Sequence, residues 1–207
     1  MPKKIIIVRH GETEWNVERR LQGWSDIPLN QQGRQQAKKV ADRLKSESIT
    51  TIYSSDHKRA KTTARAIAKA KGLKLHQTWK LREDRMGIFE GWQWEKEPDP
   101  HKESLWQQRT KARKNGDIHW KPEGGESLLD HAQRVKEFLD VITRKHERET
   151  VLIVSHGGTI NRIIEHFGFK KHTDEYIRFQ NTSVTIINHE GDKYHLQILN
   201  DISHLYD

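Results

Sequence analysis

The sequence predicts an α/β fold: a three-layer sandwich with a mostly parallel central sheet, a late antiparallel hairpin and an inserted cap. Apolar runs at residues 4–8 and 151–154 are typical of buried strands, and amphipathic helices lie between them. Two further runs, 184–187 and 194–199, flank the turn sequence HEGD and indicate a hairpin. Because 207 residues are enough for one domain with its own core, we expect a single domain over 1–207.

The first half of the chain predicts a strand, a helix, a second strand and a second helix. Residues 4–8 form the first strand, 33–46 the first helix and 51–53 the short second strand. Residues 54–56 offer side chains that can cap the second helix, and Gly72 ends it. The core faces of the two helices are formed by Ala37, Val40, Ala41 and Leu44 and by Ala60, Ala64, Ile67 and Ala68.

The second half continues the alternation after a short segment at 78–81. Ser127 begins a long helix, with Asp130 three residues further on. A helix over 159–167 follows the buried strand 151–154 and ends near a glycine. The core face of the long helix is formed by Leu128, Ala132, Val135, Leu139 and Ile142.

Residues 86–125 differ from the rest of the chain, because their periodicity is poor and they contain Pro98, Pro100 and many charges. Four of the seven tryptophans lie here: Trp92, Trp94, Trp106 and Trp120. We expect this segment to be a cap insertion that covers a site. The alternative is a loosely packed surface excursion in which tryptophans pack only against one another.

The net charge of +8 allows three interpretations. It can reflect a solvated basic surface, attraction of small anionic substrates, or binding to nucleic acid. The chain contains no recognisable nucleic-acid-binding module and no long uninterrupted basic run, so we expect no nucleic-acid partner.

The absence of cysteine excludes disulfides and thiolate metal sites, and suits a reducing compartment. No apolar stretch approaches the ~20 residues of a membrane span, and the first apolar run is too short for a signal peptide. We therefore expect a cytoplasmic protein without a membrane partner. The oligomeric state is left open by the sequence.

Two histidines stand in matched settings, one in IIIVRHG and one in VLIVSHG. His10 and His156 each follow a predicted strand, and Gly11 and Gly157 come next. Ligands bind beyond the carboxyl ends of strands in open α/β sheets, and the helix N-termini there favour anions. A single histidine at a strand end is usually structural. Two matched copies, one beside Arg9, predict that both rings converge on one anion site.

Two more charged residues are predicted near the same edge. Arg59 lies in the first turn of the helix after the strand 51–53, and an Arg fork is well suited to clamping phosphate. On local grounds Arg59 is equally consistent with a surface helix residue. Glu83 follows the segment 78–81, and a carboxyl group near phosphate can act as a general acid.

These motifs resemble, in their order along the chain, those of the histidine phosphatase superfamily, in its phosphoglycerate-mutase-like branch. The segments that carry the resemblance are RHGETEWN, QGWSDIPLN, YSSDHKRAKTTA, LREDRMGIFEGW, GGES and VSHGGTINR. The resemblance covers nearly the whole chain and implies the phosphoglycerate-mutase-like fold.

The resemblance also implies residue roles. The reaction that it implies needs no metal or cofactor. His10 would be the nucleophile that accepts the phosphoryl group, and Glu83 the proton donor to the leaving oxygen. Arg9, Arg59 and His156 would hold the phosphate oxygens, and Asn16, Gln22, Gly23 and Gly157 would contact the substrate. A neutral imidazole is a competent nucleophile near pH 7, and preorganised cations can stabilise the equatorial oxygens without a metal.

We predict metal-independent hydrolysis of phosphate monoesters, with phosphoglycerate mutase as the alternative. The mutases resembled here read Arg-His-Tyr-Gly after the acid, whereas this chain has Asp84 followed by Arg85, Met86 and Gly87. The cap has no adjacent Arg pair, only Arg109 and Arg113, with Lys111 between them. Asp84 is also expected to repel a second anionic group on the substrate.

Other functions remain open at this point. A non-catalytic phosphate-binding module would lack one of the predicted groups, and none is missing. The 13 histidines suggest a metal-dependent hydrolase, but no HExxH motif or close carboxylate–histidine set is present. His189, His195 and His204 are expected at the surface. The Trp-rich cap favours aromatic leaving groups, whereas its basic residues (Lys102, Arg109, Lys111, Arg113 and Lys114) favour a substrate with several negative charges.

Overall fold

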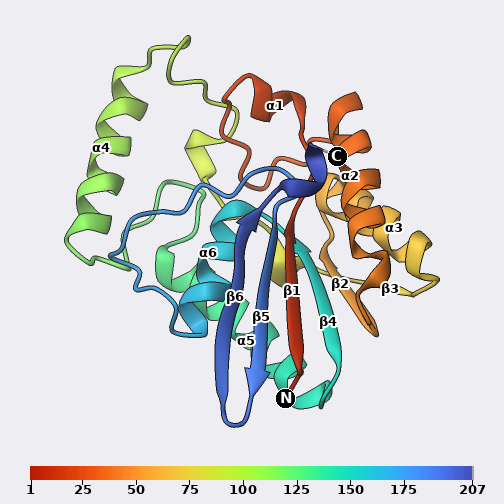
Figure 1. The fold of residues 1–207 in the computed structure, drawn as a ribbon. Coiled ribbons are helices and arrows are strands. Elements are labelled where there is room, and N and C mark those ends of the chain that lie inside the picture. The colour runs from red at the N-terminus through yellow and green to blue at the C-terminus, as the bar shows by residue number, and fades with distance from the viewer. Residues whose placement is uncertain (207) are drawn as a thin grey trace.

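A six-stranded sheet lies at the centre of the computed structural model, which describes residues 1–206 (Figure 1). The strand order is β3-β2-β4-β1-β5-β6, in which β1 pairs in parallel with β4 and antiparallel with β5. The strands are β1 Lys4–Arg9, β2 Thr51–Ser55, β3 Leu75–Thr78, β4 Thr150–Ser155, β5 Val184–Glu190 and β6 Lys193–Asp201. The predicted sheet, mostly parallel with a late antiparallel hairpin, is therefore confirmed.

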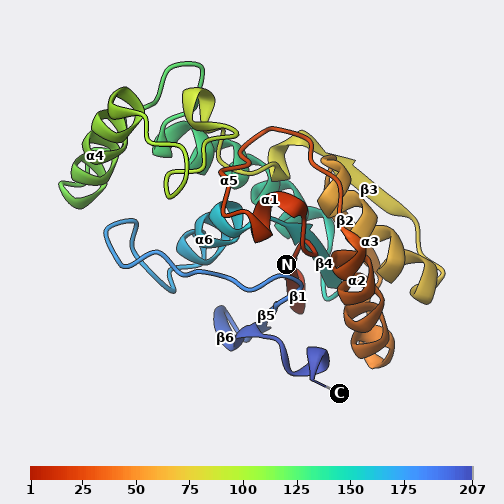
Figure 2. The ribbon, with the colours of Figure 1, turned by 90° about the horizontal axis from the view of Figure 1, so that it is seen from above.

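Helices cover both faces of the sheet and complete the three layers. Figure 2 shows α2 and α3 on one side of the sheet and α5 and α6 on the other. The helices are α1 Glu14–Val17, α2 Gln31–Arg43, α3 Lys58–Lys71, α4 Pro100–Lys114, α5 Leu128–Lys145 and α6 Gly157–His166. Single 3-10 turns lie at Leu44–Ser46, Trp79–Leu81, Gly87–Phe89 and Ser203–Leu205.

The side-chain alternation of β1 explains the two cores. Ile6 and Val8 pack with α2 and α3, whereas Ile5 and Ile7 pack with α5 and α6. All four side chains are fully buried. A strand that is covered on both faces has to be apolar throughout, which is why this stretch was recognisable from the sequence.

Several predicted boundaries were wrong by a few residues, each for a local reason. The first long helix, α2, begins two residues earlier than expected because Asn30 caps it, accepting from the amide of Gly33 at 2.7 Å. The serines predicted to cap α3 instead extend β2 to Ser55, and α3 begins after His57, which makes no side-chain cap. The capping box of Ser127 and Asp130 at the start of α5 is as predicted.

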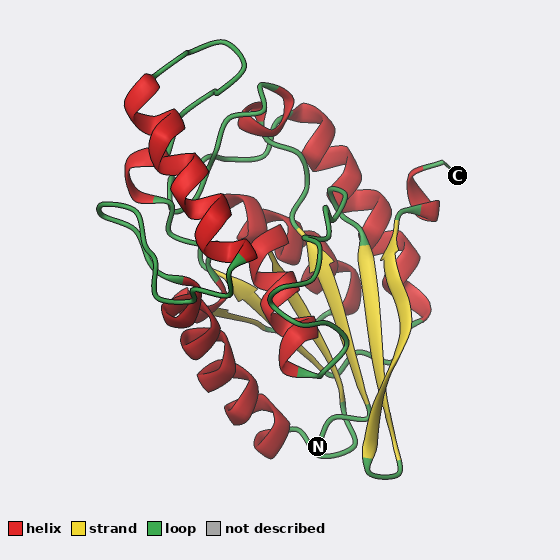
Figure 3. Ribbon diagram, turned by 90° about the vertical axis from the view of Figure 1, so that its left-hand side faces the viewer, coloured by secondary structure: helices red, strands yellow, loops and turns green. Residues whose placement is uncertain are grey.

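The segment 86–125 contains a helix that the sequence pattern did not indicate. Asp99 caps α4 through the amides of residues 101 and 102, and Pro100 occupies its first position. No residue of α4 itself is buried, so it has no apolar stripe. Figures 1 and 2 show α4 set apart from the layers that cover the sheet, and Figure 3 shows the molecule from the side on which α4 lies in Figure 1.

Aromatic side chains give this segment a small core of its own. The buried residues Met86, Phe89 and Trp92 pack with Trp106 and Trp120, and are separate from the two cores beside the sheet. The ring centroids of Phe89 and Trp106 lie 5.2 Å apart in an edge-on arrangement. The tryptophans therefore do pack against one another. This packing gives the segment 86–125 a defined structure, in contrast to the loosely packed excursion considered as the alternative.

Two other expectations concern the surface. His204 was expected to be exposed but is buried, with Nε2 3.3 Å from the hydroxyl of Thr182. His195 is exposed as expected. Within the described residues, no helix has both the length and the apolar character required to cross a membrane.

Candidate active site

The two matched histidines meet at the carboxyl ends of two paired strands. Arg9 and Ser155 are opposite each other in the parallel ladder of β1 and β4, and His10 and His156 come next. Their ring centroids lie 5.1 Å apart with a tilt of 59°. The predicted convergence is therefore observed, since parallel neighbours in register bring equivalent positions together.

The ring of His10 is oriented by its own backbone neighbour. Nδ1 lies 2.7 Å from the carbonyl oxygen of Gly11, so Nδ1 carries the proton and donates it to this acceptor. Burial, with the nearby charges of Arg9 and Arg59, lowers the pKa of His10 well below its usual value. The imidazole is therefore neutral near pH 7, and the lone pair of Nε2 is available.

The ring of His156 has the opposite tautomer because of Arg59. Nε of Arg59 donates to Nδ1 of His156 at 3.2 Å, so the proton of the neutral ring lies on Nε2. Nε2 is buried and has no hydrogen-bond partner in the described part of the chain. Burial and the charge of Arg59 lower the pKa of His156 well below its usual value. One histidine thus offers a lone pair and the other a donor.

Arg59 is fully buried, so the alternative that it is a surface residue is wrong. Its Nη1 and Nη2 donate to the carbonyl oxygens of Ser25 at 2.7 Å and Gly23 at 2.8 Å. Burial lowers the pKa of Arg59 to about 10, so it remains a cation near neutral pH. The same side chain therefore orients His156 and holds the loop that contains Gln22 and Gly23.

Arg9 and Asn16 also face the site from the first segment of the chain. Nη1 of Arg9 donates to the carbonyl oxygen of Phe179 at 2.6 Å, whereas its buried Nε has no partner among residues 1–206. Oδ1 of Asn16 accepts from the amide of Thr13 at 3.1 Å and from Nδ2 of Asn181 at 3.3 Å. These contacts orient the amide of Asn16 and leave its NH₂ group without a partner inside the described structure.

Glu83 is held at the N-terminus of α6. Its Oε2 accepts from the amide of Gly158 at 3.0 Å, and its Oε1 from the amides of Thr159 at 3.2 Å and Asp84 at 2.9 Å. A helix N-terminus is a favourable place for a carboxylate, because its first amides lack partners within the helix. The carboxyl group is thereby fixed on the wall of the same site as His10.

The backbone that presents Glu83 is clamped by residues that the sequence analysis missed. The guanidinium of Arg134 donates to the carbonyl oxygens of Lys80 at 2.9 Å, Arg82 at 2.8 Å and Glu83 at 2.7 Å. The indole of Trp24 donates to the carbonyl of Glu83 at 2.7 Å. Arg134 also pairs with Glu126, at 2.5 Å, the acid of the GGES motif. An arginine on the buried side of α5 was the sequence signal that could have found this clamp.

A cavity of about 750 Å³ opens over these groups. The predicted residues that line it are Arg9, His10, Asn16, Gln22, Gly23, Arg59 and Glu83. His156 and Gly157 are not part of the lining, although His156 contacts His10 and Arg59 directly. The outer wall is built from α4 and from the segment between α6 and β5, to which Arg113 and Tyr176 belong.

We expected the glycine after His10 to permit a sharp turn of the backbone and a close approach to a ligand, but the structure gives it a different role. A Cβ on Gly11 would lie 2.5 Å from the carbonyl oxygen of Gly33 in α2, so Gly11 permits a close contact between backbones. Its φ is not positive, and no sharp left-handed turn is involved. A Cβ on Gly157 would lie 3.1 Å from the hydroxyl of Tyr176. Both glycines therefore provide space at the edge of the site.

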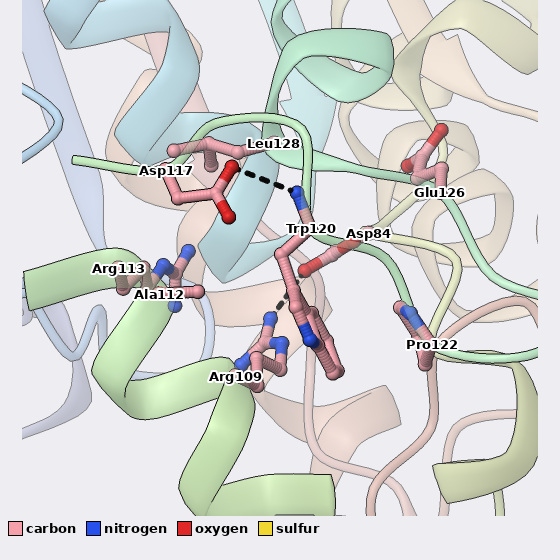
Figure 4. Close-up of a pocket in the computed structure, with 9 residues that line it drawn as sticks. All are labelled: Asp84, Arg109, Ala112, Arg113, Asp117, Trp120, Pro122, Glu126 and Leu128. Atoms are coloured by element: carbon pink, nitrogen blue, oxygen red, sulfur yellow. Dashed lines mark hydrogen bonds and ion pairs between the residues drawn. The ribbon is translucent and has the colours of Figure 1, made fainter. Parts of the chain in front are cut away.

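One group of side chains has the spacing of a metal site. Ligand atoms of Asp84, Glu126 and His131 lie within 4.8 Å of one another. Both carboxylates are already neutralised, Asp84 by Arg109 at 2.6 Å and Glu126 by Arg134 at 2.5 Å. Figure 4 shows the Arg109–Asp84 pair. Because two arginines occupy the acids, these residues fit a cation poorly.

Together these features define an α/β protein in which two arginines, two neutral histidines and one carboxyl group come together at one site. A profile of the histidine phosphatase superfamily (branch 1) matches residues 5–202. The chain belongs to the histidine phosphatase superfamily, whose members are phosphatases or mutases that act through a phosphohistidine.

Known proteins of both kinds are similar to this chain. Phosphoglycerate mutase-like protein 4 of Arabidopsis thaliana is 38% identical, over 98% of this chain and 86% of that protein. The structure of a phosphoserine phosphatase of Entamoeba histolytica with phosphoserine has a TM-score of 0.80 and 30% identity, covering 99% of this chain and 100% of that one. A mycobacterial glucosyl-3-phosphoglycerate phosphatase has a TM-score of 0.81 and 26% identity, covering 96% and 99%.

Proposed function

We propose that this protein hydrolyses small phosphate monoesters without a metal or cofactor, through a phosphohistidine on His10. The observation that carries the proposal is the opposite protonation of the two rings. Nδ1 of His10 donates to Gly11, which leaves Nε2 as a nucleophile, whereas Nδ1 of His156 accepts from Arg59, which leaves Nε2–H as a donor.

In the first half-reaction, Nε2 of His10 attacks the phosphorus atom. The ester P–O bond breaks, and Glu83, which takes up a proton when the phosphate dianion binds beside it, gives that proton to the departing oxygen, which leaves as an alcohol. Arg9, Arg59 and His156 stabilise the charge on the equatorial oxygens during transfer. Glu83 is then a carboxylate, and the phosphoryl group is bonded to His10.

In the second half-reaction, Glu83 takes a proton from a water molecule that attacks the phosphohistidine. The P–N bond breaks, the lone pair returns to Nε2 of His10, and inorganic phosphate leaves. Glu83 is protonated again, which prepares the site for the next substrate. Asn16 and Gln22, which line the cavity, contact the substrate in this proposal.

The lack of an adjacent Arg pair in the cap favours a phosphatase over a mutase. Phosphoglycerate mutase remains the second candidate, because relatives named phosphoglycerate mutase-like protein and probable phosphoglycerate mutase are 38% and 33% identical to this chain. Solved structures similar to this chain include phosphatases for phosphoserine and glucosyl-3-phosphoglycerate. The cap has no adjacent Arg pair, and α4 presents Arg109 and Arg113 on successive turns.

The test is phosphate release from 4-nitrophenyl phosphate with a chelator present. The wild type is compared with His10→Ala and with His195→Ala, a control at an exposed histidine outside the site. We expect activity in the wild type and the control, loss of activity in His10→Ala, and an acid-labile phosphoenzyme only when His10 is present. Chelator-sensitive turnover, or turnover by His10→Ala, would contradict the proposal.

The alternatives have their own outcomes. Interconversion of phosphoglycerates, without net phosphate release and dependent on a bisphosphate primer, would identify a mutase. Binding of phosphate without turnover or phosphoenzyme would identify a non-catalytic module of the same fold.

A further inference from the structure

We propose that the hydroxyl of Tyr176 is a further hydrogen-bond donor of the active site, placed to bind an oxygen of the phosphoryl group that is transferred. The inference rests on the proposed function, because it assumes that a phosphate monoester occupies the site of His10. Tyr176 lines the same cavity of about 750 Å³ as Arg9, His10 and Glu83.

The hydroxyl of Tyr176 lies over the first residue of α6. A Cβ placed on Gly157 would be 3.1 Å from this oxygen, and a Cβ placed on Gly158 would collide with Oε1 of Glu83. The two glycines that follow His156 therefore leave room for two oxygen-bearing groups, a phenol and a carboxylate. Tyr176 and Glu83 are thus neighbours at the first turn of α6.

The charges of the site act on this hydroxyl. Burial of the hydroxyl and then the carboxylate of Glu83 raise the pKa of Tyr176, whereas the charge of Arg9 lowers it. The phenol is therefore protonated near neutral pH and can donate a hydrogen bond. Among residues 1–206 the hydroxyl has no hydrogen-bond partner, so a ligand in the cavity can supply the acceptor.

Asn161 fixes the backbone that carries Tyr176. Its Oδ1 accepts from the amide of Ile177 at 3.2 Å, and its Nδ2 donates to the carbonyl oxygen of Ile177 at 3.0 Å. The same Nδ2 donates to the carbonyl oxygen of Gly157 at 2.9 Å. Asn161 is fully buried. Its side chain therefore ties the residue after Tyr176 to the glycine that lies beneath the hydroxyl.

The segment between α6 and β5 presents Tyr176 to the site and also orients Arg9. Figures 1 and 2 show this segment reaching from α6 towards α4, where the guanidinium of Arg113 lies 5.6 Å from the ring centroid of Tyr176. The carbonyl oxygen of Phe179, three residues further on, accepts from Nη1 of Arg9 at 2.6 Å. The hydroxyl and a proposed phosphate-binding arginine are thus positioned by one short stretch of backbone.

The surrounding groups favour a phosphoryl oxygen as the acceptor. Both carboxylate oxygens of Glu83 already accept hydrogen bonds from backbone amides. Nε of Arg9 and Nε2 of His156 are buried nitrogens without partners in the described part of the chain. A phosphoryl group has several oxygens and can satisfy several donors at once, and its equatorial oxygens carry the charge in the transition state.

The test is Tyr176→Phe, which removes the hydroxyl and keeps the ring. Hydrolysis of 4-nitrophenyl phosphate gives kcat/KM, and titration calorimetry gives the Kd for inorganic phosphate. We expect kcat/KM to fall about 10–100-fold, the range of one hydrogen bond to a charged acceptor, and the Kd to rise. Tyr206→Phe is the matched control, because Tyr206 is 82% exposed and lies outside the cavity lining. It should leave both quantities unchanged.

A second measurement tests the place of the hydroxyl. Gly157→Ala adds a methyl group that crowds the oxygen of Tyr176, whereas in the Tyr176→Phe background this oxygen is absent. We expect the loss of kcat/KM caused by Gly157→Ala to be clearly smaller in that background than in the wild type. Losses that multiply would show that the hydroxyl does not act from its place over Gly157.

The outcomes separate this inference from the proposed function. An unchanged Kd for inorganic phosphate in Tyr176→Phe would overturn the donor role, while hydrolysis through His10 stands. If the wild type releases no phosphate from 4-nitrophenyl phosphate, the proposed function fails. The Kd values of the wild type and Tyr176→Phe then still decide whether the hydroxyl binds a phosphate oxygen.

Discussion

Nε of Arg59 lies 3.2 Å from Nδ1 of His156, and this contact decides which nitrogen of His156 carries the proton. Arginine can only donate, so Nδ1 must accept and Nε2 must bear the hydrogen of the neutral ring. The contact is made between α3 and the residue after β4, two segments that are almost a hundred positions apart. A buried arginine thus prepares a histidine as a donor before any phosphate arrives.

Replacing Arg59 should disturb this tautomer. Arg59→Lys cannot hold Nδ1 of His156 and two loop carbonyls together, because it lacks the planar fork. We expect kcat to fall about 10²–10³-fold, the usual effect of losing a preorganised donor. ¹⁵N shifts of the His156 ring, which report its tautomer, should show the Nε2–H form in the wild type and a mixture in the variant. Arg65→Lys, on the exposed side of the same helix, is the control.

Glu83→Gln should slow turnover of an alkyl phosphate by about 10²–10⁴-fold, because the leaving oxygen then receives no proton. The loss should be smaller with 4-nitrophenyl phosphate, whose leaving group departs readily as an anion. The comparison is made in single-turnover experiments, which isolate the first transfer. Glu123→Gln, at an exposed position in the loop before the GGES motif, should have no effect. Near-wild-type rates for Glu83→Gln would remove this residue from the mechanism.

Arg134→Met should reduce both stability and kcat. The substitution frees three backbone carbonyls around Glu83 and leaves the largely buried carboxylate of Glu126 unpaired. Breaking a buried pair of this kind typically costs about 3–5 kcal/mol of unfolding free energy. Urea denaturation gives the stability, and KM should change much less than kcat if Arg134 positions Glu83.

A double variant separates the two effects of Arg134. Glu126→Gln added to Arg134→Met removes the unpaired charge, so part of the stability should return while kcat stays low. Recovery of kcat together with stability would show that Arg134 has only a structural role.

The buried histidines should make the protein sensitive to mild acid. Burial and nearby cations lower the pKa values of His10, His57, His131 and His156 in the folded state, that of His57 to about 4. The unfolded chain therefore binds protons first as the pH falls below 6.5, and the free energy of unfolding decreases. Each histidine contributes at most about 1.4 kcal/mol per pH unit, for His57 between pH 6.5 and about 4.

Urea denaturation at pH 7.5 and 5.5 measures this dependence. His57→Gln should weaken it, whereas the exposed His195→Gln should leave it unchanged. An identical dependence in the wild type and His57→Gln would show that His57 does not contribute.

The elements found from the sequence are those whose burial follows a simple period. β1 and β4 are covered on both faces, so their apolar runs and the histidines after them were evident. β3 is only partly buried and α4 has no buried residue, so neither leaves a pattern in the sequence.

The parts of the site that were missed act through contacts remote in sequence. Arg134 reaches the backbone of Glu83 from about fifty residues away, and the amide of Gly158 reaches its carboxylate from 75 residues away. No local spacing encodes such contacts. Arg59 was ambiguous for the same reason, because its burial depends on the loop that contains Gly23 and on His156.

The tryptophans are distributed unevenly, and this has an optical consequence. Neither core beside the sheet contains a tryptophan, whereas Trp92, Trp106 and Trp120 pack in the small cluster around Phe89. Indole emission should therefore follow the cap and its surroundings, while far-ultraviolet circular dichroism follows the helices that cover the sheet. Two spectra recorded in one denaturant titration would report on two different parts of the molecule, and a gap between their midpoints would measure how independently those parts unfold.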